Sequence, residues 1–143
     1  MPAAPQHLPG TLVTCTAEGA AVQFFVTNAR DPIQACHLRG EFFEVEELRL
    51  LAPHIPPGAV IADIGANIGN HAMYFDRVAQ ARRVVLFEAN PDAATHLRLH
   101  GRLNRCTTRT TSAAPSSSRT LRALSAASQA MPPWPGSGWT SSR

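Results

Sequence analysis

The 143-residue sequence contains no lysine, and its last 39 residues contain no aspartate or glutamate. Cysteine is also scarce, because only Cys15, Cys36 and Cys106 are present and none belongs to a C-x-x-C pair. This odd, widely spaced set indicates neither a zinc site nor a disulfide framework. No apolar run reaches the roughly 18 residues of a membrane span, and nothing resembles a secretory leader. We therefore expect a cytoplasmic protein with no membrane partner.

The positive charge lies in the C-terminal part of the chain. Residues 1–104 contain eight arginines and ten acids, a net charge of −2, whereas residues 105–143 contain five arginines and no acid. The overall net charge of +3 therefore comes from the tail, which is weak evidence for nucleic-acid binding. We predict no nucleic-acid partner.

The most informative segment is residues 60–71, Val-Ile-Ala-Asp-Ile-Gly-Ala-Asn-Ile-Gly-Asn-His. Its apolar start predicts a buried parallel strand with Asp63 near the carboxyl end. A loop bracketed by Gly65 and Gly69 follows, and then a helix begins. Ligands of open α/β sheets bind at the carboxyl ends of strands, so this loop is the candidate site.

The loop fits phosphate poorly. A dinucleotide fingerprint needs G-x-G-x-x-G, but Asn67 and Asn70 fill its second and third glycine positions, and there is no G-x-x-x-x-G-K-[ST]. S-adenosylmethionine has no phosphate and carries an ammonium group that Asp63 suits. Gly65 and Gly69 would let the backbone approach the methionine and ribose parts.

A second apolar run, residues 83–87, ends at Glu88, 25 residues after Asp63. At about this spacing a βαβ unit places an acid on the ribose hydroxyls, and a carboxylate accepts hydrogen bonds from both. Asn90 and Pro91 predict the start of a further helix. Two helical stripes complete a β-α-β-α pattern: Ile68, Ala72, Phe75 and Val78, then Ala93, Leu97 and His100.

With these motifs, residues 12–104 resemble the N-terminal half of an FkbM-type S-adenosylmethionine-dependent methyltransferase. The resemblance rests on residues 63–71, on Phe-Glu-Ala-Asn-Pro at 87–91, on Leu-Asn at 103–104 and on the acidic lead-in at 40–48. Ala89 departs from the family, which usually has proline there. The resemblance implies an α/β, Rossmann-like class I methyltransferase fold and methyl transfer to the hydroxyl of a small molecule or sugar.

The predicted cofactor-binding residues are Asp63, Gly65, Ala66, Asn67, Gly69, Asn70 and Glu88. For the two asparagines, satisfying the turn is an equal alternative. His71 is interpreted as a first-turn helix residue, not as a catalytic base. His96 and His100 lack the glutamate of a zincin motif and are interpreted as surface or helix-face residues. We predict no metal site and assign no catalytic residue.

Four segments are predicted. Residues 1–11 are a disordered N-terminus, and 12–57 form a β-hairpin around Glu18-Gly19 and a lead-in helix that ends before Pro56. Residues 58–104 form the cofactor-binding βαβα half-domain. Acids cluster near the start of the lead-in helix, at Glu41, Glu44, Glu46 and Glu47. The helix dipole explains them, and a part in closing the cofactor site is the alternative.

The fourth segment, residues 105–143, is rich in Ser, Thr and Pro, so we expect a fold truncated after about two parallel strands. A reading-frame shift near Arg105 is one hypothesis for this tail, a natural disordered tail is the other, and the coding DNA distinguishes them. The sequence thus predicts a truncated, inactive methyltransferase. The alternatives are a non-catalytic fragment and a different nucleotide-binding α/β protein. The methyl acceptor and the oligomeric state stay open.

Overall fold

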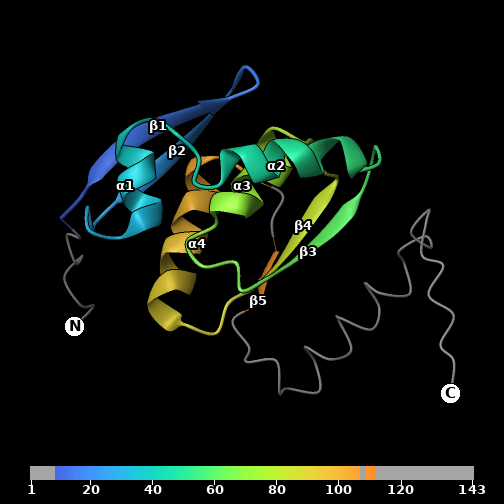
Figure 1. Cartoon of the computed structure of the whole chain (residues 1–143). Coiled ribbons are helices and arrows are strands. Elements are labelled where there is room, and N and C mark those ends of the chain that lie inside the picture. Colours follow the sequence, from blue (N-terminus) through green and yellow to red (C-terminus); the bar gives the residue numbers. More distant parts are fainter. Residues whose placement is uncertain (1–8, 107–108, 112–143) are drawn as a thin grey trace, which may run out of the picture.

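The computed structural model of the chain describes residues 9–106 and 109–111 (Figure 1). In chain order the elements are β1 (Thr11–Ala17), β2 (Ala20–Val26), α1 (Pro32–Leu38), α2 (Val45–Leu51), a 3₁₀ turn (Ala52–His54), β3 (Val60–Ile64), α3 (Asn70–Arg77), β4 (Arg83–Phe87), α4 (Pro91–Leu103) and β5 (Arg109–Thr111). β1 and β2 form an antiparallel hairpin, and the second sheet has the order β3-β4-β5 with parallel pairing. The predicted Rossmann-like α/β class is confirmed.

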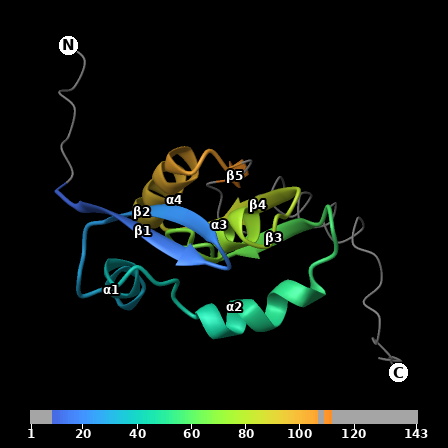
Figure 2. The same ribbon diagram turned by 90° about the horizontal axis from the view of Figure 1, so that it is seen from above.

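The helices α3 and α4 connect the two sheets. β2 packs against both of them, α3 also packs against β3 and β4, and α4 packs against β5. In both views α3 lies between α2 and α4 (Figures 1 and 2). The consequence is a shared hydrophobic core, which brings the lead-in segments against the same helices that follow the parallel strands.

The N-terminal hairpin has the predicted turn. Ala17 pairs with Ala20, and the two residues between them, Glu18 and Gly19, both have positive φ, of 48° and 79°. Two such residues in succession match the right-handed twist of the flanking strands, which is why short hairpins favour them. The alternate residues Cys15, Val22 and Phe24 are fully buried on one face.

The helices follow their local sequence signals. Asn90 caps α4, since its side-chain oxygen accepts from the backbone N–H groups of Asp92 and Ala93 at 2.9 and 3.2 Å. The sequence analysis overlooked α1, although Asp31 caps it with a 2.9 Å bond from Gln34 N and a proline follows. None of the described helices is long and apolar enough to cross a membrane.

The core is centred on aromatic rings. Phe24 and Phe42 meet edge to face at 5.7 Å between ring centroids, and Phe42 meets Tyr74 in the same way at 5.5 Å. The predicted apolar stripe of α3 lies against this core, with Ala72 fully buried and Phe75 half-buried. Aromatic pairs in this arrangement stabilise a core beyond their buried area alone.

The sheet has one strand more than predicted. β5 pairs in parallel with β4 and places Arg109 opposite Val85, inside the segment assigned to an irregular tail. Residues 109–111, Arg-Thr-Thr, contain no apolar run, but threonine is β-branched and favours strands. Thr11, assigned to the disordered N-terminus, begins β1. The remaining parts of those two predictions, residues 1–8, 107–108 and 112–143, lie outside the described residues.

Candidate cofactor site

The two predicted acids lie at adjacent strand ends. β3 and β4 pair in parallel with Asp63 opposite Leu86 and Ile64 opposite Phe87, and Glu88 directly follows β4. Because side chains alternate along a strand, Asp63, Leu86 and Glu88 point to the same face. This is the face on which Leu86 is fully buried in the core. The sheet therefore brings both carboxylates to one edge and one side.

Glu88 also holds the loop that follows β3. Its Oε2 accepts a hydrogen bond from the Asn67 backbone N–H at 2.7 Å, and its Oε1 accepts one from the Asn90 N–H at 2.7 Å. A carboxylate has about four acceptor positions, so each oxygen retains one after these bonds. The geometry leaves Glu88 able to accept from a vicinal diol while it fixes the loop.

Asp63 has an unsatisfied oxygen. The side chain is half-buried, and its Oδ2 is buried with no hydrogen-bond partner in the described part of the chain. Burial raises the pKa of this carboxyl, an interaction with His71 opposes the rise, and Glu88 adds to it. A buried acceptor without a donor costs free energy, and a ligand N–H would remove that cost.

At the beginning of the loop, Gly65 has a positive φ and open space beside it. Gly65 has φ +79°, and a Cβ added there would meet nothing within 4 Å. The N–H groups of Gly65 and Ala66 both bond to the Phe87 carbonyl, at 2.8 and 3.1 Å. The Ala66 methyl group is buried in the core, so only its backbone is placed for a ligand. Asn67 is exposed with φ +49°.

The structure shows a packing reason for Gly69 that the sequence did not suggest. It was expected to let the backbone approach a ligand, but a Cβ at this position would lie 2.5 Å from Cδ1 of Leu97 on α4. Its φ of +94° also disfavours any side chain. The glycine is needed for close packing of the loop on α4. The second glycine thus positions the site through the fold.

The Asn70 side chain is bonded to the segment that precedes β3. Its Oδ1 bonds to Nε2 of His37 at 2.9 Å and accepts from Phe43 N at 3.0 Å, while its Nδ2 donates to Phe43 O at 2.8 Å. With both ends of the amide committed and the residue buried, Asn70 joins α3 to the lead-in segments. This role differs from the turn-satisfying one considered for it, because the bonds join separate elements and not residues of the loop.

His71 lies in the first turn of α3, as predicted, and its Nε2 lies 3.0 Å from Oε2 of Glu44. His100 is wholly buried, as is Leu97 on the same predicted helix face, so the surface assignment for His100 is wrong. Its Nδ1 lies 2.7 Å from the carbonyl oxygen of Ile68, and its Nε2 accepts from Phe25 N at 2.9 Å. Sequence spacing alone could not have identified these partners, which lie 32 and 75 residues away.

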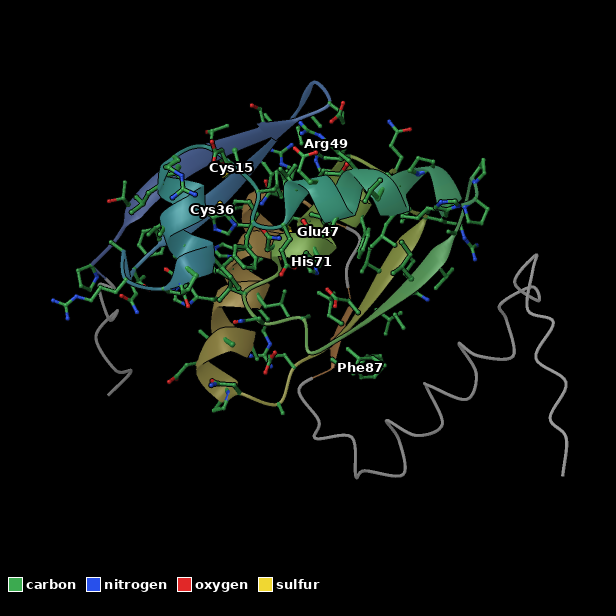
Figure 3. The ribbon with its side chains drawn as sticks, viewed as in Figure 1. Cys15, Cys36, Glu47, Arg49, His71 and Phe87 are labelled. Carbon is green, nitrogen blue, oxygen red and sulfur yellow. The ribbon has the colours of Figure 1, made fainter. Side chains whose placement is uncertain are left out.

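No group of three or more His, Cys, Asp or Glu side chains within residues 9–106 and 109–111 is arranged to hold a metal ion. The candidate site therefore consists of two strand-end carboxylates and an open glycine loop. Figure 3 labels His71, which lies on α3, the helix that follows this loop.

No sequence-family profile matches the chain, and no curated protein matches it in sequence. Solved structures do match. TYW2 of M. jannaschii in complex with AdoMet superposes with a TM-score of 0.52 at 18% identity, over 73% of this chain and 44% of that one. TYW2 of P. horikoshii in complex with MeSAdo gives 0.50 at 18% identity, over 71% of this chain and 35% of that one.

The chain shares their fold. At this level of identity the likeness concerns the arrangement of strands and helices, and the chain spans less than half the length of either protein. The resemblance to FkbM-type enzymes stays a prediction from sequence.

Proposed function

We propose that residues 58–104 bind S-adenosylmethionine, and that the chain is the cofactor-binding part of an S-adenosylmethionine-dependent methyltransferase. The observation that carries the proposal is the pair of carboxylates at adjacent parallel strand ends, Asp63 and Glu88, the second of which accepts from the loop amide of Asn67. The shared fold with a protein solved in complex with AdoMet supports it.

Each part of the cofactor has a counterpart in this arrangement. The unsatisfied Oδ2 of Asp63 suits the ammonium group, and the remaining acceptor positions of Glu88 suit the ribose diol. The open space over Gly65 leaves room for the ligand to lie against the loop. Ala66 and Asn67 would contact the ligand through backbone atoms other than their N–H groups, which are bonded within the protein, and Gly69 acts by shaping the loop.

The proposal extends to an FkbM-type reaction, methyl transfer to the hydroxyl of a small molecule or sugar in the cytoplasm, with neither nucleic acid nor membrane as partner. The resemblance in residues 63–71 and 87–91 supports this choice of acceptor. No residue is assigned as the base that removes the hydroxyl proton.

The alternative, a dinucleotide-binding protein, is disfavoured by the loop amides. A pyrophosphate needs free backbone N–H groups at this turn. Here the first two, those of Gly65 and Ala66, already donate to Phe87 O, and that of Asn67 donates to Glu88.

Replacing Asp63 with asparagine tests the proposal. Calorimetric titration with S-adenosylhomocysteine should show binding to the unaltered chain and a loss of about tenfold or more in Asp63→Asn, since a charge-assisted bond to the ammonium is removed. Stability should not fall, because a buried carboxylate with a raised pKa is harder to bury than a neutral amide. Urea unfolding measures this.

Asp92→Asn is the matched control, since Asp92 is an exposed acid in the first turn of α4. Its affinity should equal that of the unaltered chain. No binding of S-adenosylhomocysteine to the unaltered chain, or equal affinity in Asp63→Asn, would refute the cofactor assignment. Tighter binding of NAD would favour the alternative.

A further inference from the structure

One histidine ring joins the glycine loop to the N-terminal hairpin. His100 on α4 is wholly buried, and α4 lies beside β2 in both views (Figures 1 and 2). Its Nδ1 lies 2.7 Å from the carbonyl oxygen of Ile68, in the loop, and its Nε2 lies 2.9 Å from the backbone nitrogen of Phe25, in β2. The loop, the helix and the hairpin therefore meet at a single side chain.

The two bonds determine which nitrogen of the ring carries the proton. A carbonyl oxygen can only accept, so Nδ1 of His100 donates to Ile68. In the neutral ring Nε2 is then an acceptor, and it accepts from the Phe25 N–H. The carbonyl oxygen of Phe25 is farther from Nε2, at 3.3 Å, and would be its partner only in a protonated ring. In the neutral ring Nδ1 thus holds the loop, and Nε2 holds the hairpin.

The Ile68 carbonyl lies in the part of the loop that shapes the proposed cofactor site. On one side of it, the Asn67 N–H donates to Glu88 at 2.7 Å. On the other side, the Gly69 N–H closes a turn within the loop at 2.9 Å. The bond from His100 fixes the carbonyl between these two to another element. Because Ile68 directly follows Asn67, a displaced Ile68 would disturb the bond that sets the loop against Glu88.

We propose that His100 is a positioning residue of the cofactor site, whose Nδ1 keeps the glycine loop in the conformation that binds S-adenosylmethionine. The inference rests on the proposed function. With this bond in place the loop is ordered before the ligand arrives, so binding does not have to order it. Without the bond, only the fraction of molecules with an ordered loop can bind, and the apparent affinity falls in proportion to that fraction.

Two substitutions of His100 separate its two bonds. The amide of an asparagine ends where Nδ1 lies, so it can donate to Ile68 O, but it does not reach Phe25. The amide of a glutamine is one methylene farther out and reaches the position of Nε2. It can accept from Phe25 N, but it leaves Ile68 O without a donor. Both side chains are neutral, and each retains one bond of the two.

Calorimetric titration of the full 143-residue chain with S-adenosylhomocysteine should distinguish the variants. In His100→Gln the affinity should fall about tenfold, because a buried carbonyl without its donor disfavours the ordered loop. In His100→Asn it should be restored to within about threefold of that of the unaltered chain. Urea unfolding should show similar losses of stability in both variants, since each leaves one backbone group unbonded. A difference in stability would then not explain the difference in affinity.

Asn104→Leu is the matched control for a weakened hairpin. Asn104 follows α4 and bonds the N–H and C=O of Gln23 in β2, at 2.7 and 2.8 Å, and within the described chain its side chain bonds no residue of the loop. This variant should lose stability and keep its affinity for S-adenosylhomocysteine within about twofold. If His100→Gln unfolds in plain buffer, all chains are titrated in the same concentrated sucrose buffer, which favours folded states.

Equal affinities in His100→Gln and His100→Asn, whether both are reduced or both are unchanged, would mean that His100 serves only the fold and would overturn the inference. A loss in Asn104→Leu as large as that in His100→Gln would overturn it as well. Failure of the unaltered chain to bind S-adenosylhomocysteine would refute the proposed function itself, which is a different result from binding that does not depend on Nδ1 of His100.

Discussion

Gly65 and Gly69 bracket one loop, both with positive φ, but their surroundings differ. A side chain at Gly69 would meet Leu97, which is fully buried and cannot easily move, whereas one at Gly65 would enter open space. Gly69→Ala should therefore lower the free energy of unfolding by about 2–4 kcal/mol, from overpacking plus the left-handed backbone. Gly65→Ala should cost only the backbone part, about 1–2 kcal/mol.

Loss of ligand affinity should rank the two variants in the opposite order to loss of stability. The added methyl of Gly65→Ala would occupy the space assigned to the ligand, so this variant should lose more affinity for S-adenosylhomocysteine than Gly69→Ala does. Urea unfolding and calorimetric titration measure the two effects. If Gly69→Ala were as stable as Gly65→Ala, the close approach to Leu97 would not constrain the loop.

At the scale of elements, the hairpin is held to the helices by side chains that replace a neighbouring strand. Asn104 bonds both N–H and C=O of Gln23, at 2.7 and 2.8 Å. His100 accepts from Phe25 N, and Gln34 of α1 accepts from Thr27 N at 2.8 Å. These bonds satisfy the outer edge of β2, which would otherwise present free backbone groups. They also make the docking depend on neutral histidine, since a protonated ring nitrogen cannot accept.

We therefore predict an acid-sensitive hairpin. Burial lowers the pKa of His37 to about 4, and burial also lowers that of His100. Below about pH 6.5 the unfolded chain takes up these protons while the folded chain does not. The free energy of unfolding therefore decreases as the pH is lowered from about 6.5 to about 4. His37 alone should account for about 2 kcal/mol between pH 7 and pH 5. Urea unfolding at the two pH values measures this loss.

His37→Gln should reduce the pH dependence, whatever it does to stability at pH 7, because a glutamine does not titrate. A stability that is flat from pH 7 to pH 5 in the unaltered chain would contradict the assignment of neutral, buried histidines.

At the scale of the molecule, the parallel sheet is unevenly covered. Ile61 and Leu86 face the core, but Ile64, whose side chain points to the other face, is 64% exposed at the end of β3. Figure 2 shows β3 beside β4, on the side of the sheet away from β5. At Ile64 this face of β3 is therefore less covered than the face that packs against the core.

We predict that the 143-residue chain does not transfer methyl groups at normal enzymatic rates. Holding the acceptor oxygen in line with the methyl and sulfur supplies about 7–11 kcal/mol of the barrier, and a site open to water loses its electrostatic preorganisation. Transfer of radiolabelled methyl from S-adenosylmethionine to small hydroxyl compounds measures the activity. Binding of S-adenosylhomocysteine without turnover is the expected combination. Multiple turnovers with any such acceptor would contradict it.

The sequence by itself determined the local features: the hairpin turn at Glu18-Gly19, the cap at Asn90, and the spacing that puts Asp63 and Glu88 at the ends of two parallel strands. These follow from short-range rules of periodicity, turn conformation and capping, in which a residue and its neighbours in the chain suffice. β5 was missed because its threonines form no apolar run, although their β-branching was visible.

Only the tertiary structure decided what several of these residues contact. Gly69 faces Leu97, Asn70 faces His37 and Phe43, and Glu44 faces His71, each across 27 or more positions of the chain. A side chain's partner is set by how helices and sheets pack, and the pattern of apolar and polar residues specifies which face is buried without specifying what lies against it. The same asparagine or glycine in a loop can therefore bind a ligand or hold the fold, and the packing determines which.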